Sequence, residues 1–170
     1  MRNKKIEKII QKIMPVNKDL EEITIKKFDN LTKPAKSLGE LEKIIALAAG
    51  VYGTLNPSLK RKVVFLMAAD HGVTVEKISA YPAEITRQMV LNFLNGGAAI
   101  NILTEHFGIE VAITDIGVKG EFADIKELKG LNKRKIAHGT SNMVNGPAMT
   151  PEMAEKSILT GYEVFEESYS

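Results

Sequence analysis

The stretch that decides the fold is Val63-Val64-Phe65-Leu66-Met67-Ala68-Ala69, followed directly by Asp70. An unbroken apolar run of this kind, without polar alternation, is typical of a strand that is buried on both faces of a parallel sheet. A second such run extends from Ile109 to Ile116. Between them, residues 83–106 carry a helical pattern with a break at Gly96-Gly97. Strand, helix and strand in this order predict a right-handed βαβ unit and therefore an α/β fold.

Helical patterns flank this unit on both sides. From Asp19 to Val51 apolar residues recur at helical spacing, and Pro34 divides the run. Ser37 is expected to cap the second of these helices, with Glu40 completing a capping box. Near the other end, Thr150-Pro151-Glu152 combines a hydroxyl cap, a first-turn proline and an acidic residue at the positive end of the helix dipole, and so predicts a last helix.

The segment between the second strand and the last helix has weaker patterns. Residues 124–131 could form a short helix, and residues 133–137 are expected to lead into a third strand or a loop. The following stretch, from His138 to Gly146, is dense in turn-forming residues. This part of the chain therefore contributes loops beside the predicted sheet.

Composition and charge are those of an ordinary globular chain. The 170 residues are 44% apolar and 26% charged, enough to bury a core in one α/β domain with a small helical addition. Lysine and arginine number 23 and aspartate and glutamate 21, a balance that argues against a nucleic-acid or membrane partner. Cysteine is absent, which excludes thiolate chemistry and fits a reducing, cytoplasmic location.

Polar residues follow both predicted strands at the edge where parallel sheets bind ligands. Asp70 and His71 come after the first strand, and Asp115 lies near the end of the second. These side chains could serve acid–base or metal chemistry, as in a hydrolase. Alternatively, the aspartates cap loops by accepting hydrogen bonds from backbone amides. No metal site is expected, because the three histidines match no zinc-ligand spacing.

Several motifs together resemble one known family. The longest runs Ala69-Asp70-His71-Gly72-Val73, then Ile78-Ser79-Ala80-Tyr81-Pro82-Ala83-Glu84-Ile85-Thr86-Arg87-Gln88-Met89-Val90, and continues through Asn92-Phe93-Leu94-Asn95-Gly96-Gly97-Ala98-Ala99-Ile100-Asn101. Three shorter blocks come in the family's order: Lys33-Pro34 with Ser37-Leu38-Gly39, Asp115-Ile116-Gly117-Val118, and Gly139-Thr140-Ser141-Asn142 with Pro147-Ala148-Met149-Thr150. From about Asp29 onward, the chain is similar to the nicotinate-nucleotide–dimethylbenzimidazole phosphoribosyltransferases.

The resemblance implies a Rossmann-like, three-layer parallel sheet, here partial, with residues 1–57 as a helical segment of a smaller domain and residues 58–170 as the first part of the α/β domain. The family works as a homodimer. It transfers phosphoribose from nicotinate mononucleotide to 5,6-dimethylbenzimidazole, a step of cobalamin lower-ligand assembly, and uses no metal or organic cofactor. By the same resemblance, Ala80, Tyr81 and Gln88 belong to the pocket that binds the benzimidazole.

The sequence also departs from the family pattern. Ala35, Lys36 and Glu40 replace the proline or alanine, the glycine and the arginine often found around Ser37-Leu38-Gly39. The family's general base is a glutamate far downstream, in chains about twice this length. The chain is therefore expected to be a truncated part of the enzyme that has no catalytic residue of its own. An alternative is a non-catalytic benzimidazole-binding subunit or a partner in a split enzyme.

Overall fold

The computed structural model describes residues 3–58, 60–123 and 129–169 of the chain, which fall into two compact units. One unit comprises Met1–Ile6 with Arg61–Ser170, and the other is Glu7–Lys60. In chain order the helices and strands are α1 (Lys4–Lys12), α2 (Lys18–Asp29), α3 (Glu40–Tyr52), β1 (Val63–Ala69), the 3-10 helix η1 (Gly72–Glu76), α4 (Glu84–Leu94), α5 (Ala99–His106), β2 (Glu110–Gly117), β3 (Leu131–Lys133) and α6 (Pro151–Tyr169). The assignment of residues 1–57 and 58–170 to the family's two domains stays a prediction.

The larger unit is built on a three-stranded parallel sheet in the order β1-β2-β3. Both long strands coincide with the apolar runs of the sequence, which confirms the predicted strand pair. Val63 pairs with Glu110 at one end, and Ala69 pairs with Gly117 at the other, after a register shift between Ala68 and Ala69. Because the strands are parallel, Asp70 and the residues after Gly117 come together at the carboxyl edge.

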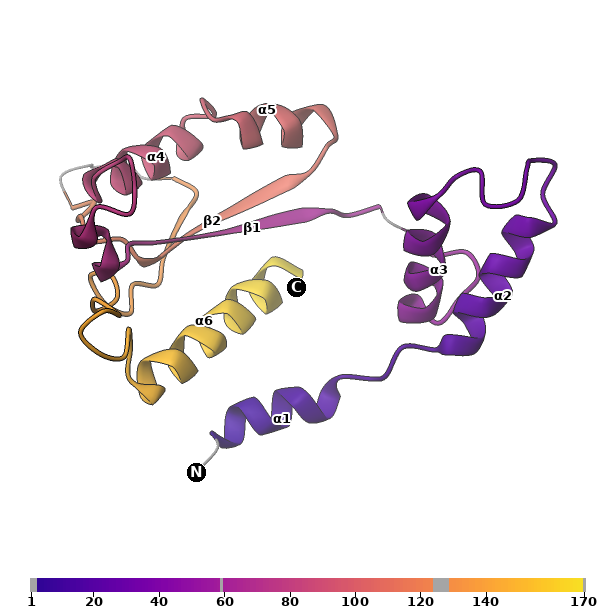
Figure 1. Ribbon diagram of the computed structural model, residues 1–170, viewed down its shortest axis with the longest axis horizontal. Helices are drawn as coiled ribbons and strands as arrows, with labels where there is room; N and C mark the ends of the chain where they lie inside the picture. Colours follow the sequence, from indigo (N-terminus) through magenta and orange to yellow (C-terminus); the bar gives the residue numbers. More distant parts are fainter. Residues whose placement is uncertain (1–2, 59, 124–128, 170) are drawn as a thin grey trace. The chain divides into compact units, whose positions relative to one another are not determined.

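Helices cover both faces of this sheet, which gives three layers (Figure 1). On one face, α4 and α5 pack on the strands. The buried core there consists of Ala68, Val90, Ile113, Val118 and Phe122, with Leu66, Leu91, Phe93, Leu94, Val111 and Leu131 packed around it. On the other face lies α6, and the ring centroid of its Phe165 is 5.8 Å from that of Phe65 on β1. The predicted α/β fold with a partial three-layer parallel sheet is confirmed.

Local sequence signals account for the break between α4 and α5 and for the start of α6. The predicted break at Gly96-Gly97 separates α4 from α5, and the Asn101 side chain bridges it: its amide donates to the Phe93 carbonyl at 2.9 Å. The hydroxyl of Thr150 accepts the N–H of Met153 at 3.2 Å, as expected for the cap of α6. Hydrogen bonds from its own backbone N–H and from Thr150 lower the pKa of Glu152. The predicted helix over 124–131 falls largely outside the described residues, while Leu131 begins β3.

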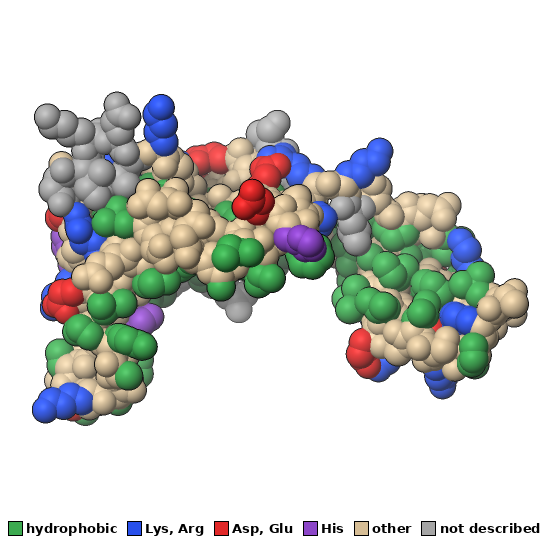
Figure 2. All heavy atoms as spheres, turned by 90° about the horizontal axis from the view of Figure 1, so that it is seen from above, with side chains coloured by type: hydrophobic (Ala, Val, Ile, Leu, Met, Phe, Trp, Pro, Cys, Tyr) green, Lys and Arg blue, Asp and Glu red, His purple; other side chains and the backbone are tan. Residues whose placement is uncertain are grey.

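The smaller unit pairs α2 with α3 at close range. A Cβ atom added at Gly50 of α3 would lie 2.7 Å from Cγ1 of Val16 and 2.9 Å from the Asn17 carbonyl oxygen. The absence of a side chain at Gly50 therefore lets α3 approach the start of α2 closely. Apolar side chains remain on the surface of this unit (Figure 2, right). Those of α3 that are at least half exposed are Leu41, Ile44, Leu47, Val51 and Tyr52. Within the described residues no helix is long and apolar enough to span a bilayer.

The predicted capping box before α3 is wrong. Gly39 is the N-cap residue, and no side chain caps it. Instead, the N–H of Leu38 donates to Oε1 of Glu42 at 3.2 Å, and the Lys33 ammonium donates to the same oxygen at 2.8 Å. Glu42 is 3% exposed. The buried Glu42 carboxylate thus accepts hydrogen bonds from both ends of the 33–38 turn, and no cap from the Ser37 hydroxyl is required.

The Glu42 interaction predicts acid sensitivity of the smaller unit. The hydrogen bond from Lys33 lowers the pKa of Glu42 below its ordinary value of 4.5; burial opposes this, and the Leu38 N–H adds to it. A lowered folded-state pKa stabilises the fold at pH values above the unfolded pKa, and this contribution disappears as the pH falls through the folded value. We therefore expect the melting temperature of Glu42→Gln to fall less steeply than that of the original chain as the pH is lowered below about 4.5. Glu40→Gln, which breaks an exposed pair with Lys43, should leave that slope unchanged.

The backbone at Lys36 has a conformation that favours glycine, the residue often found there in the family pattern. Its φ is +59°, in the left-handed region where glycine has no steric penalty. Lys36→Gly is therefore expected to stabilise the smaller unit by about 1 kcal/mol in chemical denaturation, although glycine also adds some entropy to the unfolded chain. Glu22→Gly, at an exposed position in the middle of α2, is the control and should destabilise by about 1 kcal/mol. Destabilisation by both substitutions would contradict the assigned strain.

Candidate functional site

Asp70 is the centre of the carboxyl edge of the sheet. It is 5% exposed, and its backbone N–H donates to the Gly117 carbonyl at 3.0 Å. One carboxyl oxygen accepts the hydroxyl of Thr86 at 2.6 Å, and the other accepts the N–H of Lys119 at 2.7 Å. Its carbonyl accepts the N–H of Thr140 at 3.0 Å. Asp70 thus joins the ends of β1 and β2, the first turn of α4 and the 139–142 loop.

Glycines allow the two loops at this edge to touch. A Cβ atom added at Gly72 would lie 2.6 Å from backbone atoms of Thr140, Ser141 and Asn142. The N–H of Gly72 donates to the Thr140 hydroxyl at 3.2 Å. Gly139 has φ +86°, and its Cβ would lie 3.0 Å from the Asp70 carbonyl oxygen. The motifs Asp70-His71-Gly72 and Gly139-Thr140-Ser141-Asn142 are therefore one interlocked structure.

Asp115 also has a structural role. Its Oδ1 accepts the N–H of Val118 at 2.8 Å, which closes the turn after β2. Its other oxygen faces the ammonium of Lys135 at 3.5 Å, and that ammonium donates to the carbonyls of Val118 and Gly120 at 2.8 and 2.7 Å. For both aspartates the loop-capping interpretation is confirmed. Among the described residues, no three acidic, histidine or cysteine side chains are placed to hold a metal ion.

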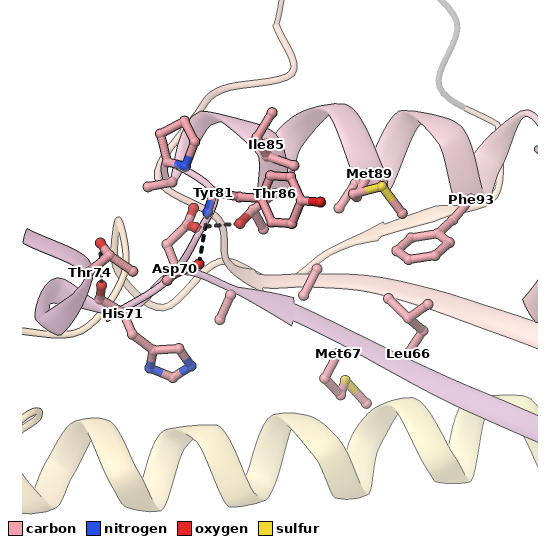
Figure 3. Close-up of a pocket in the computed structure, with 16 residues that line it drawn as sticks. Leu66, Met67, Asp70, His71, Thr74, Tyr81, Ile85, Thr86, Met89 and Phe93 are labelled. Carbon is pink, nitrogen blue, oxygen red and sulfur yellow. Dashed lines mark hydrogen bonds between the residues drawn. The ribbon is translucent and has the colours of Figure 1, made fainter. Parts of the chain in front are cut away.

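A cavity of about 370 Å³ opens between the end of β1 and the first turns of α4 (Figure 3). Its apolar wall combines side chains of both elements: Leu66, Met67, Ala68 and Ala69 from β1, and Ile85, Met89, Val90 and Phe93 from α4. The polar end consists of Asp70, His71, Thr74, Ser79, Tyr81 and Thr86, with Pro82 and Ala83. An open cavity with mostly apolar walls and a few polar groups at one end is typical of small-molecule sites.

A second hollow of about 210 Å³ lies beside the same strand ends, next to α6. Its lining includes Ile116, Ile136, Met149 and Met153. His71 borders both hollows, and Figure 3 draws its imidazole on the side of β1 away from Tyr81. The carboxyl edge is thus hollowed on both sides of Asp70 and His71.

The predicted benzimidazole-binding residues lie in different positions relative to the first cavity. Tyr81 borders it, and its side chain is largely exposed at the opening. Ala80 and Gln88 are exposed, Ala80 just before Tyr81 and Gln88 on α4, and neither is among the lining residues. A ligand-binding role for these three residues stays a prediction. No local sequence pattern points to Thr86 or Thr140, because the role of each comes from contacts with residues far away in the chain.

Comparisons with known proteins agree with this architecture. A family model described as "Phosphoribosyltransferase" matches residues 13–170. The nicotinate-nucleotide–dimethylbenzimidazole phosphoribosyltransferase of Pelodictyon phaeoclathratiforme is 44% identical over 96% of this chain and 46% of its own length. That of Geobacter sulfurreducens is 45% identical over 94% of this chain and 44% of its length. A crystal structure of the Thermus thermophilus enzyme matches with 46% identity and a TM-score of 0.78, over 88% of this chain and 44% of that one.

The fold and the hollowed carboxyl edge define a Rossmann-like α/β protein with cavities on both sides of the end of β1. The similarity over nearly the whole chain makes the identification specific. The chain belongs to the nicotinate-nucleotide–dimethylbenzimidazole phosphoribosyltransferase family. It spans a little under half the length of the curated relatives it matches. The hydrolase hypothesis built on Asp70, His71 and Asp115 is therefore wrong.

Proposed function

We propose that this chain takes part in phosphoribosyl transfer from nicotinate mononucleotide to 5,6-dimethylbenzimidazole, which gives α-ribazole 5′-phosphate and nicotinate for cobalamin lower-ligand assembly. The relatives carry the name of this reaction, and the match extends over residues 13–170. The family's homodimeric assembly and cytoplasmic location are part of the same proposal. No metal or cofactor is required by the transfer as proposed.

The observation that carries the proposal is the apolar cavity bordered by Tyr81. Its volume of about 370 Å³ lies within the range of small-molecule sites. A benzimidazole is flat and largely apolar, so the walls of β1 and α4 can bury its faces while Tyr81 stacks at the opening. Gln88, one turn into α4, is exposed beside this cavity and not part of its lining; under the proposal its amide reaches the polar edge of the ring system from outside the apolar walls.

The transfer itself requires one bond to form and one to break. A ring nitrogen of the acceptor attacks C1′ of the ribose with its lone pair, from the face opposite the nicotinate. The bond from C1′ to the pyridine nitrogen breaks, and its electron pair returns to that nitrogen, so the anomeric centre inverts. The proton on the acceptor's other ring nitrogen must leave to a base.

We further propose that residues 1–170 bind the acceptor but do not supply this base. Asp70 is the acidic residue among those that line the cavity. Both of its carboxyl oxygens already accept hydrogen bonds, so neither is available to take the acceptor's proton. The family's base is a glutamate outside these residues. The expected result is saturable acceptor binding with negligible turnover. Turnover by residues 1–170 near the rate of a full-length relative would refute this division of roles.

The direct test is calorimetric titration of 5,6-dimethylbenzimidazole into the chain. Tyr81→Ala and Gln88→Ala are each expected to weaken binding about tenfold, the effect of losing one stacking or hydrogen-bonding partner. Tyr52→Ala is the matched control, because Tyr52 is an exposed tyrosine on α3 of the other unit. Binding without turnover would also fit a non-catalytic benzimidazole-binding subunit. Adding a second chain that carries the family's remaining segment distinguishes a split enzyme from a non-catalytic subunit. The mixture regains phosphoribosyl transfer if this chain is half of a split enzyme, and stays inactive if it is a non-catalytic subunit.

A further inference from the structure

One side-chain hydrogen bond connects the two walls of the first cavity. The hydroxyl of Thr86, in the first turn of α4, donates to Oδ1 of Asp70 at the end of β1 over 2.6 Å, and both residues border the cavity (Figure 3). We propose that this hydrogen bond is a positioning device: it holds the first turn of α4 against β1 and thereby sets the width of the cavity. Its role in acceptor binding rests on the function proposed above.

The Asp70 end of this connection is fixed. The second carboxyl oxygen accepts the Lys119 N–H at 2.7 Å, so the carboxyl group cannot rotate without breaking that bond. The backbone is held as well, by hydrogen bonds to the Gly117 carbonyl and from the Thr140 N–H. The Asp70 side chain is therefore buried and held by several hydrogen bonds, so its position determines where the Thr86 hydroxyl can bind.

At the other end of the hydrogen bond, Thr86 lies in the first turn of α4, the second wall of the cavity. The N–H groups of Ile85 and Thr86 donate to the carbonyls of Pro82 and Ala83, at 3.1 and 3.0 Å, so the segment that follows Tyr81 is tied to this turn. Farther along α4, Met89 and Phe93 face the cavity (Figure 3). A shift of the first turn therefore moves Tyr81 and the apolar wall together, and a flat ligand that must contact both walls loses contacts with one of them.

Thr86 acts through Asp70 and not on the ligand. Its hydroxyl proton is committed to the carboxyl group, so it is a positioning residue and takes no part in the bond changes at C1′. Valine has nearly the same shape without the hydroxyl, whereas serine keeps the hydroxyl and loses a methyl group. Thr86→Val and Thr86→Ser thus separate the hydrogen bond from the packing.

Two measurements on the intact chain test the proposal. Hydrogen–deuterium exchange reports the holding of residues 80–88 without any ligand, and titration of 5,6-dimethylbenzimidazole reports the consequence for binding. Thr86→Val is expected to speed exchange in residues 80–88 and to weaken binding about tenfold, the scale of one hydrogen bond to a charged group. Thr86→Ser should keep both properties within about twofold of the original chain. Thr104→Val is the control: that buried hydroxyl donates only within α5.

The outcomes are distinguishable from failure of the proposed function. Unchanged exchange in Thr86→Val, or equal acceleration in Thr104→Val, overturns the positioning role whether or not the acceptor binds. Faster exchange with unchanged acceptor affinity overturns the control of cavity width. If the original chain does not bind the acceptor, the proposed function fails, and the exchange data alone decide whether the hydrogen bond holds α4.

Discussion

Gly72→Ala is expected to destabilise the larger unit by about 3 kcal/mol or more, at the upper end of over-packing substitutions. The added Cβ would lie 2.6 Å from three backbone atoms of the 140–142 loop, and backbone cannot rotate away as a flexible side chain can. The loop would have to move, which would strain the Gly72–Thr140 and Thr140–Asp70 hydrogen bonds. Thermal unfolding should show a fall of roughly 10 °C for a chain of this size.

Gly161→Ala is the matched control for this substitution. Gly161 lies inside α6, and an added Cβ there meets nothing within 4 Å. Because alanine is the better helix former, this change should stabilise the chain by about 0.5–1 kcal/mol. A Gly72→Ala chain that melts within about 2 °C of the original would show that the two loops are not interlocked as described.

Phe122→Ala is expected to cost about 3–5 kcal/mol, the range for removing a buried aromatic ring from a core. Phe122 is 3% exposed and packs with Val90, Ile113 and Val118. The guanidinium of Arg87 lies 5.6 Å from its ring centroid, so truncation also removes a cation–π contact with α4. Urea denaturation, followed by circular dichroism, measures the loss.

Phe107→Ala provides the comparison at an exposed ring. Phe107 is 57% exposed at the end of α5 and makes an edge contact with His106. Its truncation should cost no more than about 1 kcal/mol. Equal effects of the two substitutions would contradict the placement of Phe122 in the core, and with it the path of the chain after β2.

The sequence was most informative where the signal is local. The unbroken apolar runs predicted β1 and β2, since burial on both faces of a sheet leaves no room for polar alternation. Thr150 predicted the cap of α6 because its partner, Met153, is only three residues away. The sequence-based prediction of the cap of α3 was wrong. Ser37 and Glu40 match the capping-box motif, but in the structure the buried Glu42 binds Lys33 and the Leu38 N–H and so stabilises the turn.

The candidate site was only partly predictable for the same reason. The strand-end rule located Asp70, and the family resemblance singled out Tyr81, which borders the cavity. Nothing in the spacing of residues reveals that Thr86 donates to Asp70, or that Thr140 accepts from Gly72 across 68 positions. Phe122 was equally hidden, because it follows a turn and belongs to no periodic run.

By itself, the sequence determined the strand–helix–strand order, the parallel pairing, the break between α4 and α5, the start of α6 and the family. Each of these follows from the period of apolar residues, from caps within one turn, or from motifs that are read along the chain. The tertiary structure alone decided what joins the loops at the carboxyl edge: the four connections of Asp70, the contact of Gly72 with the 140–142 loop, and the cavity between β1 and α4. Such contacts depend on the register of the sheet and on helix packing, which place residues that are distant in sequence side by side.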